Sequence, residues 1–133
     1  MIRAACLCLV LSGPAAAQDR ITAEQFLDFA VGRTLHFHVF GSGQLVGIEE
    51  FLRRDLSVWK PRGRDCVYGQ ITIEQGQLCF LYDDELPHQK SCWYTFSQDG
   101  TLMVRGTEMF GAEVQVVEQI TDAPLDCPNA PTS

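Results

Sequence analysis

Residues 67–82 read VYGQITIEQGQLCFLY, two short runs that flank the dipeptide Gln75-Gly76. Apolar and polar side chains alternate along the first run, which is typical of a half-buried strand. Gln75-Gly76 predicts a tight hairpin turn, because glycine accepts the positive φ that such turns require. Setting Glu74 opposite Gln77 then pairs the two runs residue by residue. The apolar side chains that share the core face in this register are Ile71, Ile73, Leu78 and Phe80.

Further β runs lie on both sides of this hairpin, and turn residues separate them. They span residues 35–39, 45–52, 56–60, 92–97, 102–107 and 112–120. Val46 and Ile48 share one face of the second run, and residues 49–54 also fit a helical turn. Because no helix separates the runs, they predict a mainly β fold, an antiparallel meander of about eight strands. Such a meander forms either a small barrel or an open, curved sheet.

One short helix is expected before the strands, at residues 22–31. Thr22 and Gln25 form a capping box, in which each side chain can satisfy the other's backbone N–H. Phe26 and Ala30 fall on one apolar stripe, and Gly32 ends the helix. A helix of this length must dock on an apolar surface to be stable.

Residues 1–17 have the pattern of a removable signal peptide. Arg3 precedes an apolar run at residues 4–11, and Ala15 to Ala17 provide the small residues of a cleavage site. The run is far shorter than the ~20 residues that span a bilayer. We therefore expect export to the periplasm or the exterior, with cleavage near Ala17 and no transmembrane segment.

The remaining chain is expected to form one β-rich domain at residues 18–121, followed by a coil tail at residues 122–133. Lys and Arg number 10 against 17 Asp and Glu, and loss of Arg3 takes the net charge from −7 to −8. A chain this acidic is repelled by nucleic acid and by anionic membranes. Composition thus argues against a nucleic-acid-binding function.

Four cysteines follow the leader: Cys66, Cys79, Cys92 and Cys127. An even number in an exported chain predicts two disulfides. Structural zinc sites usually contain closely spaced ligand pairs such as Cys-x-x-Cys, which is absent here. Placing Cys79 opposite Cys92 puts Leu78 opposite Trp93 and Trp93 on the core face. This register favours Cys79–Cys92, which leaves Cys66–Cys127 to tether the tail.

No catalytic motif is visible, and the sequence predicts neither an enzyme nor a cofactor. His36 and His38 share one face of a strand, a spacing that suits a pair of metal ligands, with His88 as a third. The residues that alternate with these two histidines are apolar and are expected to face the core. Solvent exposure of the histidines is therefore the simpler interpretation. Residues 83–85 form an acidic cluster without the spacing of a calcium loop. Glu49 has no obvious carboxylate partner for glycosidase chemistry.

A basic cluster is the main candidate binding surface. Aromatic side chains within such a cluster favour binding of an anionic polymer or an acidic envelope protein. The same charges would also protect a sheet edge from aggregation. The members of this candidate surface, called here the basic edge, are Arg53, Arg54, Trp59, Lys60, Arg62 and Arg64.

Several segments resemble a group of small exported bacterial proteins of unknown function. They include Cys66-x-x-Gly69, Gly76-Gln-Leu-Cys79-Phe80-x-Tyr82-Asp83 and Cys92-Trp93, and the similarity covers residues 22–93. The chain departs from that pattern at Ile71, where an aromatic residue is common. The resemblance implies a bacterial periplasmic setting and transfers no activity or site residue.

Three functions follow as hypotheses. The first is a non-enzymatic binding or interaction module of the cell envelope that uses the basic edge. The second is a lipocalin-like carrier of a small apolar ligand, with Phe37, Phe80 and Trp93 around it. The third is a small inhibitor that presents a loop to a hydrolase.

Overall fold

A computed structural model describes residues 13, 18–107 and 113–128. Apart from Gly13, the predicted signal peptide lies outside these residues, as do Ala112 and residues 129–133. The elements, in chain order, are β1 (Gln18–Arg20), α1 (Ala23–Ala30), β2 (Thr34–Val39), β3 (Leu45–Arg53), β4 (Leu56–Pro61), β5 (Val67–Glu74), β6 (Gln77–Tyr82), a 3-10 turn η1 (Pro87–Gln89), β7 (Ser91–Gln98), β8 (Thr101–Gly106) and β9 (Val114–Thr121).

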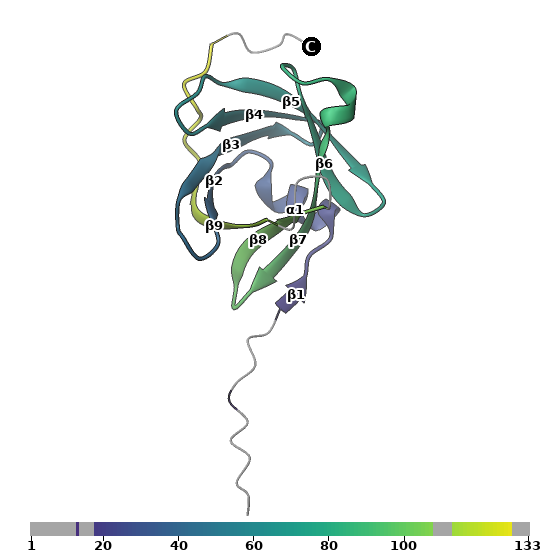
Figure 1. Ribbon diagram of the computed structural model, residues 1–133, viewed down its shortest axis with the longest axis vertical. Coiled ribbons are helices and arrows are strands. Elements are labelled where there is room, and N and C mark those ends of the chain that lie inside the picture. The colour runs from purple at the N-terminus through teal and green to yellow at the C-terminus, as the bar shows by residue number, and fades with distance from the viewer. Residues whose placement is uncertain (1–12, 14–17, 108–112, 129–133) are drawn as a thin grey trace, which may run out of the picture.

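Strands β2 to β9 form a closed antiparallel barrel of eight strands (Figure 1). Each strand pairs with the next along the chain, and β9 returns to pair with β2, which closes the ring. Of the two architectures predicted from the sequence, the protein therefore forms the barrel and not the open, curved sheet. Bulges at His36/Phe37 and Phe37/His38 interrupt the pairing of β2 with both neighbours and help it to bend.

The central hairpin has the predicted register. Glu74 pairs with Gln77, and Ile71 pairs with Phe80. The turn residues Gln75 and Gly76 have φ values of 52° and 74°, as the positive-φ turn requires. The prediction from alternation and turn chemistry is confirmed here.

Strand β3 differs from the expectation in two ways. The alternative of a helical turn over residues 49–54 is wrong, since the strand continues to Arg53. The buried positions are Gly47, Glu49 and Phe51, on the face opposite Ile48. The expectation from hydrophobicity was that the apolar residues of this strand share the buried face. Instead, Ile48 points outward and the Glu49 carboxyl points into the barrel.

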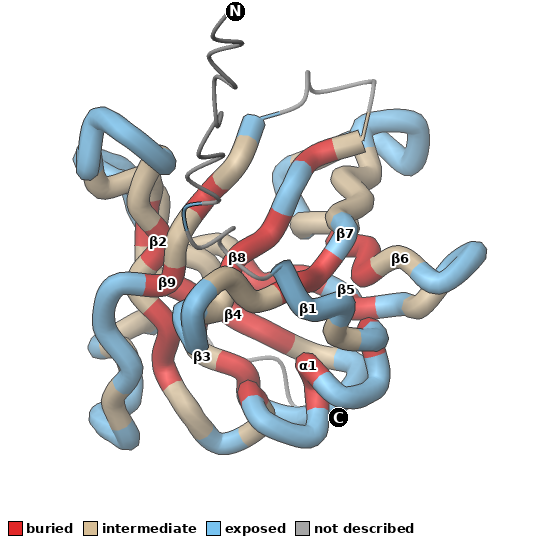
Figure 2. The backbone as a smooth tube through the Cα atoms, turned by 90° about the horizontal axis from the view of Figure 1, so that it is seen from below, coloured by how far each residue is buried: buried red, intermediate tan, exposed pale blue. Residues whose placement is uncertain are grey.

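The helix α1 closes one end of the barrel. Thr22 caps it with the predicted capping box, and Ala23, Phe26, Leu27 and Ala30 are buried. The Gly32 N–H donates to Phe51 O at 2.8 Å, which ties the end of α1 to the end of β3. Figure 2 shows buried positions along the strands and on α1, whereas most turns are exposed.

The short strand β1 was not predicted. It pairs with residues 96–98 of β7, beyond the part of β7 that pairs with β6. All three of its side chains are exposed. Because none of the three side chains is buried, the segment shows no alternation of apolar and polar residues that would indicate a strand.

Both predicted disulfides are present, Cys66–Cys127 and Cys79–Cys92, with Cα–Cα distances of 5.8 and 4.0 Å. Cys79 pairs directly with Cys92, and Leu78 pairs with Trp93, as the strand register predicted. The two disulfides indicate an oxidising, extracytoplasmic environment. In the described part of the chain, no helix has the length and apolar character needed to cross a membrane.

Candidate functional site

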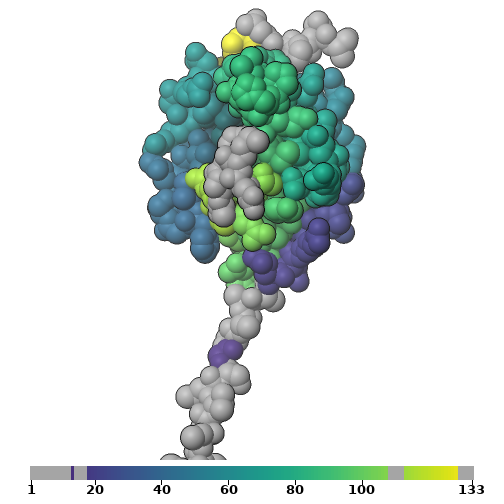
Figure 3. Space-filling model, turned by 45° about the vertical axis from the view of Figure 1, so that its right-hand side comes forward, coloured from purple at the N-terminus to yellow at the C-terminus, as the bar shows by residue number. Residues whose placement is uncertain are grey.

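The barrel contains a cavity of about 340 Å³. The cavity lies between α1, which closes one end of the barrel, and the opposite end, called here the mouth. Phe26 of α1 lines it, together with Leu78, Phe80 and Val104 of the barrel strands. The remaining lining residues are Phe37, Val46, Glu49, Trp59, Tyr82, Glu85, Ser91, Trp93, Glu113 and Gln115. Glu85 follows β6 and Glu113 precedes β9, so both lie at the mouth. The connection from β6 to β7, in green, projects at this end (Figure 3).

Aromatic rings dominate the wall of the cavity. Phe37 and Trp59 meet edge to face with ring centroids 6.2 Å apart, and Phe80 stacks on Tyr82 at 6.0 Å. Below them, Phe51 lies between Phe26 and Phe80. These contacts hold the rings of the wall in defined orientations, which suits a preformed binding site.

Two glycines in the wall leave room for aromatic rings. A Cβ atom on Gly47 would lie 2.4 Å from Trp59 Cζ2, and one on Gly69 would lie 2.6 Å from Tyr82 Cδ1. The indole and the phenol therefore lie flat against the backbone of neighbouring strands. This arrangement keeps both rings out of the barrel centre, where they would otherwise fill the cavity.

Gly47→Ala tests this arrangement. We expect the new methyl group to displace the Trp59 indole and to lower the free energy of unfolding by about 1–3 kcal/mol, as overpacking does. Tryptophan emission should change too, because both tryptophans of the chain line the cavity. Urea unfolding and emission spectra measure both effects. Gln70→Ala, at an exposed position of β5, is the control; a Gly47→Ala protein that behaves like it contradicts the close packing.

Glu49 is the polar centre of the cavity. Its side chain projects from the inward face of β3 and is buried, with 4% of the residue exposed. Ser57 Oγ donates to Glu49 Oε1 at 2.5 Å, and Tyr82 Oη donates to Oε2 at 2.8 Å. Burial raises the pKa of Glu49 to about 7, against the opposing effect of these two hydrogen bonds.

Three other ionisable groups, Tyr82, Glu85 and Glu113, line the cavity toward its mouth. Burial raises the pKa of Tyr82 well above its usual value, and the Glu49 charge raises it further. Burial also raises the pKa of Glu85, whose carboxylate accepts from the Tyr82 N–H at 3.3 Å. Glu113 accepts from the Gln115 side-chain amide at 3.1 Å. A carboxyl group therefore lies at the centre of the cavity and two more lie at its mouth.

The structure does not gather the basic edge into one surface. Arg53 and Arg54 lie at the turn before β4, while Arg62 and Arg64 follow its other end, about 20 Å away for a strand of this length. Arg53, Arg54 and Arg64 form ion pairs with Asp55, Asp28 and Asp84 at 2.7, 2.5 and 3.5 Å. Most of these cations therefore balance neighbouring acids.

The assignment of Trp59 to the basic edge was wrong. Its side chain points into the barrel, packs against the core and lines the cavity. Lys60, the next residue, is exposed, because successive side chains of a strand point to opposite faces. Trp59 and Lys60 are thus neighbours in sequence but lie on opposite faces of β4.

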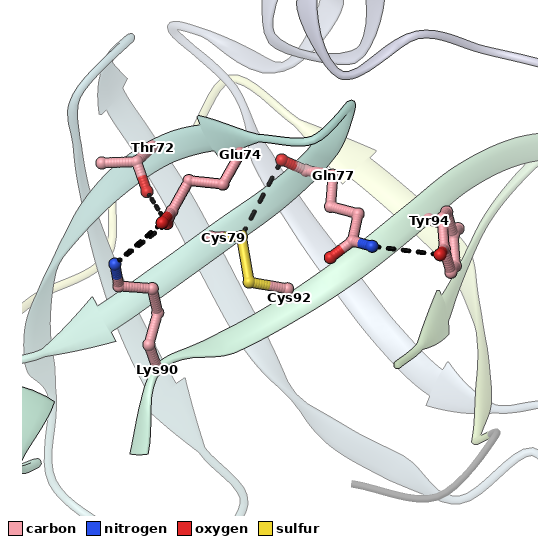
Figure 4. Close-up of a disulfide and its surroundings, with 7 residues drawn as sticks. All are labelled: Thr72, Glu74, Gln77, Cys79, Lys90, Cys92 and Tyr94. Carbon is pink, nitrogen blue, oxygen red and sulfur yellow. Dashed lines mark hydrogen bonds and ion pairs between the residues drawn. A yellow bond between two sulfur atoms is a disulfide. The ribbon is translucent and has the colours of Figure 1, made fainter. Parts of the chain in front are cut away.

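The cysteines are structural. Cys79 and Cys92 join β6 to β7 on the outer face of the barrel, and the nearby Lys90 forms an ion pair with Glu74 at 2.9 Å (Figure 4). Within the described ranges, Glu74, Cys79 and Cys92 are the one group of three potential metal ligands. Two of the three are consumed by the disulfide, so this group does not fit a metal ion.

The two histidines of β2 do not form part of such a group. His36 and His38 are partly exposed, and burial lowers the pKa of His36, with a further effect from His38. His38 Nδ1 lies 3.0 Å from Gly43 O and 3.5 Å from the Glu118 carboxylate. His38 thus contacts the following turn and β9 rather than a ligand-binding centre.

Sequence reasoning missed Glu49, the central residue of the cavity. One signal was available: Gly47, Glu49 and Phe51 alternate along β3 as small, acidic and aromatic side chains. That pattern identifies an inward carboxyl only if the inward face of β3 is known, and closure of the barrel determines this face.

Comparisons with protein-family models, with curated proteins and with solved structures find no match for this chain. The proposals below therefore rest on the geometry of the barrel. The resemblance to small exported bacterial proteins stays a prediction.

Proposed function

We propose that the mature domain is a non-enzymatic binding protein of the bacterial periplasm that holds a small, mainly apolar molecule inside its barrel. The observation behind this proposal is the cavity of about 340 Å³ between α1 and the barrel mouth. Its volume falls at the lower end of the ~300–1,000 Å³ range of ligand pockets. Aromatic walls with a few polar groups are typical of such pockets.

The periplasmic location is supported by the two disulfides and by the predicted signal peptide. Disulfides persist in oxidising compartments, and the resemblance noted in the sequence concerns exported bacterial proteins. The surface function of the basic edge is less well supported, because three of its five cations already pair with acids. No comparable observation supports an inhibitory loop.

Titration with the neutral fluorophore N-phenyl-1-naphthylamine tests the proposal. We expect its emission to rise and shift to the blue on addition of the purified mature domain, because apolar surroundings exclude water. Val104→Phe should reduce its affinity at least tenfold, since Val104 lines the cavity and a larger side chain fills the space.

Val116→Phe is the matched control. Val116 belongs to β9 and pairs with Met103, and it does not line the cavity. Equal loss of affinity in both variants, or no emission change with the unmodified domain, would count against ligand binding in the barrel.

A further inference from the structure

We propose that the ligand of the barrel is an organic cation, a small apolar or aromatic amine, and that Glu49 is its counter-ion. This inference rests on the proposed function and narrows it to one chemical class. Three features of the cavity support it: the sign of its charges, the unpaired carboxyl at its centre and the aromatic rings around that carboxyl.

All the charged side chains that line the cavity, within the described ranges, are acidic. They are Glu49 on β3, Glu85 after β6 and Glu113 before β9. Among the residues that the structure describes, no lysine, arginine or histidine appears in the lining. Charges of one sign in a low-dielectric cleft attract the opposite charge, so this cavity favours a cation over a neutral or anionic molecule.

Within the described part of the chain, Glu49 has hydrogen-bond donors but no counter-ion. Both of its partners, Ser57 and Tyr82, are hydroxyl groups, and none of the ion pairs among the described residues includes Glu49. A buried carboxylate is costly unless it is paired. Among the described residues, Oε2 accepts from Tyr82 alone, so it can accept a further hydrogen bond from an ammonium group, which has N–H donors and no acceptor.

Aromatic side chains line the same cavity as this carboxyl. Trp59 pairs with Glu49 across β3 and β4, and the Tyr82 hydroxyl bonds to it. Phe80, stacked on Tyr82, and Trp93 line the same cavity. Cations bind to the faces of aromatic rings, and to tryptophan most strongly. An alkylammonium group at Glu49 would therefore meet a carboxylate and several ring faces together.

The cavity volume limits the size of the cation. At about 30 Å³ for each water-sized unit, 340 Å³ holds roughly eleven such units. A matched series of this size is 4-phenylbutylamine, 4-phenylbutan-1-ol and 4-phenylbutyrate, which share one apolar body and differ in charge. A simple amine is fully charged at pH 8, where most of Glu49 is also ionised because burial raises its pKa to about 7 only.

Isothermal titration calorimetry of the mature domain at pH 8 tests the inference with these three probes. We expect the amine to bind at least tenfold more tightly than the alcohol, and the carboxylate to bind most weakly. In Glu49→Gln the ratio of amine to alcohol affinity should fall at least tenfold, because the charge is lost while the shape is kept. Glu24→Gln, an exposed change on α1, should leave the ratio as it was.

The possible failures are distinguishable. Equal affinities for the three probes, or tightest binding of the carboxylate, would overturn the cation inference while leaving a barrel that binds apolar molecules. An unchanged ratio in Glu49→Gln would remove Glu49 as the counter-ion. Absence of binding by all three probes, together with no binding of N-phenyl-1-naphthylamine, would overturn both this inference and the proposed function.

Discussion

Replacing Cys66 and Cys127 together with serine should lower the free energy of unfolding by about 4 kcal/mol. The two cysteines are 61 positions apart, and cross-linking a loop of this length removes much of the entropy of the unfolded chain. The tail also bonds to the barrel, through the Leu125 N–H to Glu50 Oε2 at 2.8 Å and Thr34 Oγ1 to Ala123 O at 2.7 Å. Loss of the disulfide weakens these contacts too.

The second disulfide provides the comparison. Cys79 and Cys92 are 13 positions apart, so replacing both with serine should cost about 3 kcal/mol. Urea unfolding under oxidising conditions measures the stability of both variants. The free energy of unfolding should depend more steeply on urea in the variant that lacks Cys66–Cys127, because loss of the longer cross-linked loop lets its unfolded chain expand more. A larger loss from the Cys79–Cys92 pair would contradict the loop-length argument.

Glu49 should make the stability of the protein depend on pH. Its pKa is about 7 in the folded protein against a usual value of 4.5, so between these values the folded state binds more protons than the unfolded state. The free energy of unfolding should therefore fall as pH rises from about 4.5 to above 7, and the cost is then fully present at pH 8. At 1.36 kcal/mol for each pKa unit, the total is about 3 kcal/mol.

Glu49→Gln removes this titration while keeping the shape of the side chain. We expect the variant to be more stable than the unmodified protein at pH 8, by up to about 3 kcal/mol, and equally stable near pH 4. Urea unfolding at a series of pH values gives both profiles. Burial raises the pKa of Glu85 as well, but that effect is common to both proteins and cancels in their difference.

Glu24→Gln is again the control, since Glu24 is exposed in the first turn of α1 and its loss should cost only a few tenths of a kcal/mol. Parallel profiles for Glu49→Gln and the unmodified protein would show that the Glu49 carboxyl is not desolvated in the folded barrel.

Much of the fold could be predicted from local features of the chain. The Gln75-Gly76 turn set the register of β5 and β6, because a two-residue turn leaves one pairing that keeps the apolar side chains together. The same parity predicted that Cys79 faces Cys92 and that Trp93 faces the core. The capping box set the start of α1, since Thr22 and Gln25 satisfy backbone groups within one turn.

The candidate site was largely beyond such reasoning. Glu49 is one of two adjacent glutamates, and no local feature marks it as the buried one; Trp59 was grouped with the cations next to it in sequence. Both side chains point into the cavity because pairing of β3 with β2 and β4 assigns their strand faces. The functional surface expected from the arginines was dispersed instead, since β4 places them at opposite ends.

Short-range features of the chain were thus sufficient for the eight strands of the barrel, the central register, the helix start and the Cys79–Cys92 disulfide, because each depends on residues close in sequence or on strand parity. Closure of the barrel between β2 and β9, the covering of one end by α1 and the cavity around Glu49 arise only in the folded protein. They depend on contacts between residues far apart in sequence, and these contacts determine which face of each strand is buried.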